Sequence, residues 1–160
     1  MEPIPQDASR IVELLKQGPL RIWKAIRSVQ TQQLYVRTDK EPWSISDILV
    51  HLRACSDVWG ETIMAMLTED NPIQRYKSPR AFMKKPKYQD REFATAQKSY
   101  AQERQKLVKV LTKLDDAGWA RPGTYTGTTP RHRNQTVWSL TNRIVNHEQP
   151  HLDQIESLLR

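Results

Sequence analysis

Apolar residues recur every three or four positions in four long stretches of the chain, which is the spacing of one face of an α-helix. These stretches cover residues 11–29, 48–66, 93–114 and 137–158, and the third predicted helix ends near Gly118. The first stays in phase across Gly18-Pro19 and predicts one helix bent at the proline. Only five glycines occur in 160 residues, which argues against a sheet protein with many tight turns. The pattern predicts a single all-α domain over residues 1–160.

Two of the predicted helices have recognisable starts. Ser44 precedes Asp47 by three residues, a variant of the capping box in which both side chains satisfy backbone N–H groups. Thr136 is expected to cap the last helix. Residues 68–89 carry prolines among basic and polar residues, and residues 120–135 are rich in turn-forming types, so both segments are expected to connect helices.

Three of the four histidines fall on the apolar faces of these helices. His51 lies on the second helix, and His147 and His151 lie one turn apart on the last. An unpaired imidazole on a buried face loses its hydration without compensation, and helical bundles bind metals between facing helices. We therefore expect one divalent metal at these three residues, with a hydrogen-bonded core histidine as the alternative for His51. Zinc, nickel, copper and iron all accept three imidazoles.

The terminal pair also fits the HExxH pattern, in which Glu148 would act as the base of a metallopeptidase. Such enzymes take a third ligand downstream, and no histidine follows His151. Pro150 lies between the two histidines and predicts a kink, whose size decides whether their side chains converge.

Two segments carry a resemblance to a known family. WSISDILVHL, which contains His51, and NHEQPHLDQI, which contains His147, His151 and Gln154, are similar to the DinB/YfiT-like family of metalloenzymes, and the resemblance covers nearly the whole chain. It implies a four-helix bundle in up-down-down-up order, with nickel or zinc held by these three histidines, and often a homodimer. Members of this family look like thiol-dependent S-transferases, isomerases or hydrolases, so the resemblance implies no single reaction.

Two hypotheses of function follow. The first is a metal-dependent hydrolase or thiol-dependent S-transferase, in which the ion activates water or a low-molecular-weight thiol toward a small-molecule substrate. Glu148, Glu103 and Tyr100 are the candidates for acid–base work or for lining the pocket, and a packing role is the alternative for each. The second hypothesis is a non-catalytic, metal-stabilised bundle that acts in dimerisation or partner binding.

The net charge and the cysteine content indicate which binding partners and which cellular compartment to expect. The formal charge is +7, and the basic residues between positions 75 and 87 could steer an anionic substrate. No nucleic-acid-binding motif accompanies them, so nucleic acid is not expected. Cys55 is the single cysteine and is expected to pack in the core. We expect a cytoplasmic protein without a membrane span, because no signal-like start or long apolar segment occurs.

Overall fold

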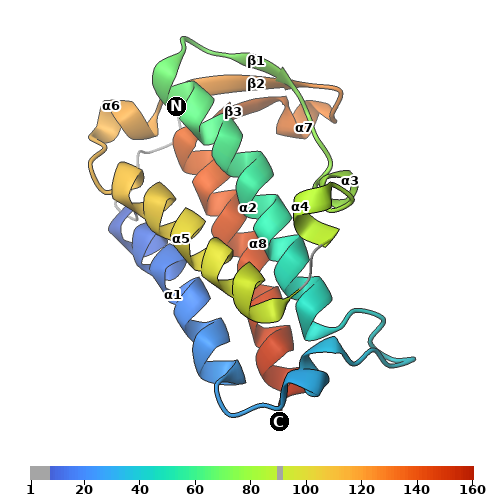
Figure 1. Ribbon diagram of the computed structural model, residues 1–160. Helices are drawn as coiled ribbons and strands as arrows, with labels where there is room; N and C mark the ends of the chain where they lie inside the picture. The colour runs from blue at the N-terminus through green and yellow to red at the C-terminus, as the bar shows by residue number, and fades with distance from the viewer. Residues whose placement is uncertain (1–7, 90–91) are drawn as a thin grey trace.

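Four long helices form a bundle in the computed structural model, which describes residues 8–89 and 92–160. They are α1 (Ala8–Ile26), α2 (Ile45–Thr68), α5 (Phe93–Leu111) and α8 (Val137–Leu158). Helices α5 and α8 each pack against both α1 and α2, which closes the bundle. In Figure 1, α1 and α8 run down the bundle and α2 and α5 run up it. The predicted fold class and the up-down-down-up order are confirmed.

The connections contain more regular structure than the hydrophobic pattern predicts. The short elements are η1 (Thr31–Tyr35), β1 (Ile73–Arg75), α3 (Pro79–Phe82), α4 (Pro86–Gln89), α6 (Asp116–Trp119), β2 (Pro122–Thr126), α7 (Pro130–Arg133) and β3 (Asn134–Thr136). The strands form one sheet in the order β1-β2-β3, with β1 parallel and β3 antiparallel to β2. This sheet covers the end of the bundle where α2 ends and α8 begins (Figure 1). Strands of three to five residues are too short to show an alternating pattern.

Both predicted helix starts are confirmed. The Ser44 hydroxyl accepts a hydrogen bond from the Asp47 backbone N–H at 3.1 Å, and the Asp47 carboxylate accepts one from the Ser44 N–H at 2.9 Å. Thr136 and Ser139 form the equivalent box at the start of α8. These caps satisfy backbone donors that have no partner within the helix.

Two predicted helices extend too far. Helix α1 ends at Ile26 rather than near residue 29, and α5 ends at Leu111, after which α6 forms a separate short helix. Asp115 caps α6 by accepting a hydrogen bond from the Gly118 N–H at 2.8 Å. Apolar spacing continues past both helix ends because the following residues also cover the core, and periodicity does not distinguish them from helix.

Pro150 does not interrupt the last helix. Helix α8 is continuous from Val137 to Leu158 with the proline inside it. Pro150 and Asn146, whose carbonyl loses its helical donor, are both exposed, so water can satisfy that carbonyl. The missing backbone hydrogen bond therefore lies on the solvent-exposed side of α8, and the inward face of the helix is intact.

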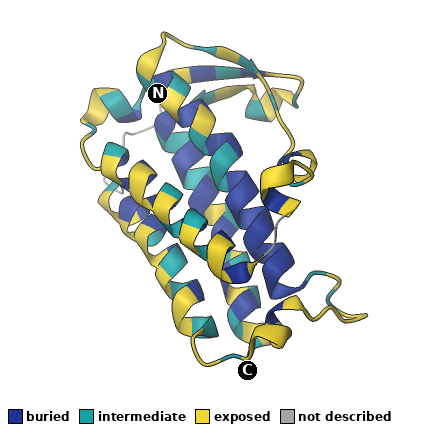
Figure 2. Ribbon diagram, viewed as in Figure 1, coloured by how far each residue is buried: buried dark blue, intermediate teal, exposed yellow. Residues whose placement is uncertain are grey.

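Helix α2 is the most deeply buried element, as Figure 2 shows. It packs against α5 and α8 within the bundle and is covered on its remaining side by α3 and η1. Residues on nearly all of its faces are therefore buried, polar ones included. Among the helices of the described ranges, none combines the length and apolar character needed to cross a bilayer.

Candidate metal centre

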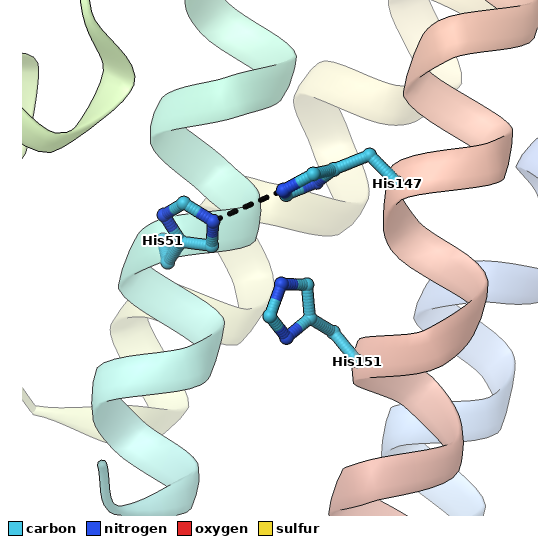
Figure 3. Close-up of side chains that lie close together, drawn as sticks. All are labelled: His51, His147 and His151. Atoms are coloured by element: carbon cyan, nitrogen blue, oxygen red, sulfur yellow. Dashed lines mark hydrogen bonds between the residues drawn. The ribbon is translucent and has the colours of Figure 1, made fainter. Parts of the chain in front are cut away.

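Three histidines converge between α2 and α8. His51 points from α2 toward His147 and His151 on α8 (Figure 3). The Nε2 atoms of His51 and His147 lie 3.2 Å apart, and one ring nitrogen of each histidine lies within 4.8 Å of the others. Nitrogens bound tetrahedrally to one ion at about 2.0–2.1 Å would be separated by about 3.3 Å. Within residues 8–89 and 92–160 this is the only group of three such side chains that could hold a metal.

Neighbouring side chains orient the three rings. Trp43 packs edge-on against His51, with ring centroids 4.8 Å apart, and stacks on His151 at 6.3 Å. Trp59 packs edge-on against His147 at 5.3 Å. Gln154 Oε1 lies 3.1 Å from His151 Nδ1, and an N–H donated to it would leave Nε2 for a metal. Such outer contacts fix the direction of a ligand before the ion binds.

Burial keeps two of these imidazoles in the form that binds metal. Burial lowers the pKa of His51 to about 3, with further lowering from the neighbouring histidines and Arg80. Burial likewise lowers the pKa of His147 to about 4, with contributions from His151, Arg143 and Arg80. Both rings are therefore neutral near pH 7, and only the neutral imidazole offers a lone pair to a metal.

The metal-free protein is expected to lose stability as the pH falls from about 7 to about 4. The unfolded chain protonates its histidines below about pH 6.5, whereas the folded chain keeps His51 and His147 neutral until pH values near 3 and 4. The unfolded state then binds more protons, so the free energy of unfolding falls as the pH drops through this window. Urea unfolding between pH 7.5 and pH 5 measures the slope. His51→Gln should flatten it, and an equal slope in both proteins would contradict the shifted pKa.

Glu148 lies in a buried ion pair with Arg104 of α5 and is not part of the converging group of histidines. Its carboxylate accepts hydrogen bonds from Arg104 at 2.7 and 2.9 Å and from the hydroxyl of Tyr100, both on α5. Burial raises the pKa of the Glu148 carboxyl, and the positive charge of Arg21 opposes this because it stabilises the charged form. Both oxygens are engaged, so the geometry gives Glu148 and Tyr100 a packing role and does not favour the peptidase arrangement of the HExxH pattern.

Gly18 on α1 provides the space for this ion pair. A Cβ atom there would lie 2.8 Å from Glu148 Oε2 and 3.1 Å from Arg104 Nη1. We expect Gly18→Ala to destabilise the protein by about 1–3 kcal/mol, because both charged groups are held by hydrogen bonds and cannot easily move. Gly60 on α2 is the matched control, since nothing lies within 4 Å of its added Cβ, and Gly60→Ala should stabilise the helix by up to about 1 kcal/mol. Equal unfolding midpoints for the two variants would contradict the packing argument.

Glu103 lies in a different pocket, between α2 and α5. It shares a hydrogen bond with Asp57, and burial raises the pKa of Glu103 to about 7. Lys87 Nζ lies 2.9 Å from Asp57 Oδ2. This pocket has a volume of about 480 Å³ and contains none of the three histidines in its lining. The structure therefore does not bring Glu103 together with the three histidines.

Cys55 is buried one turn after His51, as expected for a packing residue. Its Sγ lies 3.7 Å from His51 Nε2, and burial raises the pKa of the thiol to about 12. In the metal-free protein the Cys55 thiol is therefore protonated near neutral pH, and it packs beside the three histidines.

The basic side chains between residue 75 and residue 87 make different kinds of contact. Lys77 lies 3.5 Å from Glu61, and Lys87 is paired with Asp57. Arg80 instead stacks over Trp43, with its Cζ 5.0 Å from the ring centroid. Since Trp43 contacts His51 and His151, Arg80 is the member of this segment that lies at the metal centre.

Arg143 is a neighbour of the centre that the sequence analysis missed. Its guanidinium lies over Trp59, 4.9 Å from the ring centroid, and over Tyr76 at 5.7 Å. Arg143 precedes His147 by four residues, so both side chains project from the same face of α8. That spacing was visible in the sequence, but a basic residue near the start of a helix is usually exposed.

Comparison with known proteins identifies the family. The profile of the DinB superfamily matches residues 14–155. The chain belongs to the DinB superfamily. Among solved structures, this DinB-superfamily bundle is similar to that of YfiT from Bacillus subtilis, with a TM-score of 0.81 and 17% identity over 99% of this chain and 89% of YfiT. YfiT is described as a probable metal-dependent hydrolase with an unusual four-helix bundle topology. No curated protein shows significant sequence similarity to this chain.

Proposed function

We propose that this DinB-superfamily protein is a metal-dependent enzyme whose ion is held by His51, His147 and His151. One observation carries the proposal: three imidazoles from two facing helices converge with their ring nitrogens within 4.8 Å of one another. Burial disfavours protonation of two of these imidazoles. Removing polar rings from water costs free energy, and bringing them together in a metal-free core does not recover it. A shared ion would explain this cost.

The donor set suits zinc or nickel with an open coordination position. Three neutral nitrogens and no carboxylate or thiolate leave room for an exchangeable fourth ligand. An ion in this site would act as a Lewis acid that lowers the pKa of bound water or of a bound thiol. The protein contributes neutral ligands of fixed orientation, and Trp43 and Trp59 exclude water from two sides of the histidines.

The class of reaction we favour is hydrolysis, in line with the description of YfiT, and transfer to a low-molecular-weight thiol is the second choice. Both reactions need a nucleophile formed near neutral pH, which the same open position would supply. Neither needs Glu148, whose carboxylate is occupied by Arg104. The proton released when water or a thiol is activated would then pass to solvent or to a group of the substrate.

Metal analysis of the untagged protein tests this proposal, because a histidine tag would itself bind metal. After removal of metal with a chelator, reloading with zinc, nickel or cobalt should restore one ion per chain. Ester or amide hydrolysis, or thiol transfer, should disappear with the chelator and return with the ion. A protein that takes up no ion from any of the three salts would refute the proposal.

A non-catalytic bundle that acts as a homodimer is the second candidate. The observation in its favour is an apolar groove of about 860 Å³ between α1 and α5. Leu20 and Trp23 line it and are 55% and 52% exposed. Sedimentation of the metal-loaded protein tests this candidate, since a monomer that binds metal and turns over substrate would exclude it.

A further inference from the structure

Arg143 is half-buried and has the features of an anion-binding group. Its guanidinium is held between the rings of Trp59 and Tyr76, which fixes its plane. Its Nη1 atom is fully buried and finds no acceptor in the part of the chain that the structure describes. By contrast, Arg21 and Arg104 both bind carboxylates of α8. A buried guanidinium N–H without an acceptor is costly, so an acceptor from outside the chain would be strongly stabilised there.

A second unsatisfied donor lies beside it. The indole Nε1 of Trp59 is also buried without an acceptor among the described residues. The face of the Trp59 ring contacts Arg143, and the same ring makes a T-shaped contact with His147. Two hydrogen-bond donors that lack acceptors therefore lie beside His147. A site for a cationic substrate would instead present hydrogen-bond acceptors, and a site for an apolar substrate would present neither donors nor acceptors.

Arg80 provides positive charge on another side of the histidines. It is exposed and stacks over Trp43, which contacts both His51 and His151. The metal centre thus lies between two arginine–tryptophan pairs, one from α8 and α2 and one from α3 and the segment before α2. The exposed Arg80 can attract an anion at long range, whereas the half-buried Arg143 can bind it at short range.

We propose that the metal centre acts on small substrates that carry a carboxylate group, which Arg143 binds while the reacting atom occupies the open metal position. The guanidinium fork fits a carboxylate or a phosphate, and a carboxylate is favoured because it brings one charge rather than two to a half-buried place. Arg80 draws the anion to the opening. This inference rests on the proposed function, since without a metal there is no reacting centre for Arg143 to serve.

Three thiols of similar size test the proposal on the cobalt-loaded protein. They are 3-mercaptopropionate, 2-mercaptoethanol and 2-mercaptoethylamine, which carry a carboxylate, a hydroxyl and an ammonium group. Each reports its own binding through the sulfur-to-cobalt charge-transfer band, so no activity is needed. We expect 3-mercaptopropionate to bind about 10- to 100-fold more tightly than 2-mercaptoethanol, as one buried charge-assisted hydrogen-bond pair allows, and 2-mercaptoethylamine to bind most weakly.

Arg143→Gln should remove the preference for 3-mercaptopropionate while binding of 2-mercaptoethanol and the cobalt content stay unchanged. Arg131→Gln is the matched control, because Arg131 is exposed on α7 and its loss changes the net charge equally. An equal loss in both variants would assign the effect to net charge and overturn the proposal. The wild-type ranking of the three thiols is a test that does not depend on the folding of any variant.

The outcomes distinguish failure of the carboxylate proposal from failure of the metal-binding proposal. If the wild-type protein binds cobalt but takes the three thiols with equal affinity, the carboxylate proposal is wrong and the metal centre stands. If the wild-type protein binds no cobalt, the proposed function fails, and the role of Arg143 fails with it.

Discussion

His147→Ala is expected to abolish stoichiometric metal binding and to lower the affinity of the site by about 100-fold or more. Zinc sites with four protein ligands bind with roughly 10–16 kcal/mol, so one ligand contributes about 2.5–4 kcal/mol. His147 is the ligand nearest to His51, with 3.2 Å between their Nε2 atoms, and its loss leaves only one histidine on α8. Titration of the metal-free protein with zinc against a chelating indicator measures the affinity.

His51→Ala and His151→Ala should each weaken binding strongly as well, because three nitrogens are the minimum for this type of site. His132→Ala is the matched control, since His132 lies on α7 and is not part of the converging group. The far-ultraviolet circular dichroism of all four variants should stay helical, because the apolar faces of the bundle are unchanged. Full metal content in the three ligand variants would show that the ion binds elsewhere.

The largest effect on stability is expected at the buried ion pair between Arg104 and Glu148. Each side chain is only 2% exposed, and the carboxylate also receives the hydroxyl of Tyr100. Glu148→Gln leaves the guanidinium buried without its counter-charge, which should cost about 3–5 kcal/mol in the free energy of unfolding. Urea unfolding at pH 7 measures the difference.

Replacing both members of the pair by apolar residues should cost less than either single change, because no uncompensated charge then remains in the core. Lys77→Met provides the control for an exposed pair. Lys77 and Glu61 lie 3.5 Å apart with side chains about 60% exposed, so the loss should be below about 1 kcal/mol. A similar small loss for Glu148→Gln would mean that the carboxyl is neutral in the folded protein.

The ion pair also explains how α8 can present two histidines at a defined position. Glu148 follows His147 directly, and Arg104 binds Glu148, the Leu15 carbonyl at 3.0 Å and the Ser56 hydroxyl at 2.8 Å. One arginine of α5 therefore links α8, α1 and α2 in the same layer of the bundle as the metal centre. Rotation of α8, which would displace His147, is opposed by these bonds.

The sequence by itself determined the parts of this protein that depend on neighbours along the chain. Apolar spacing predicted the four long helices, and Ser44 and Thr136 marked two helix starts, because helical period and capping involve residues within one or two turns. The same local rule placed His147 and His151 on one face of α8. The resemblance carried by the segments around His51 and His147 added the order of the helices.

Tertiary packing decided the parts that depend on which helices face one another. It brought His51 within reach of His147, turned Glu148 toward Arg104 instead of the metal centre, and placed Arg143 between Trp59 and Tyr76. Each of these contacts joins residues that are distant in sequence, and a helical period does not specify the rotation of one helix against another. For that reason the three candidate ligands could be named from the sequence, whereas the charged groups that surround them could not.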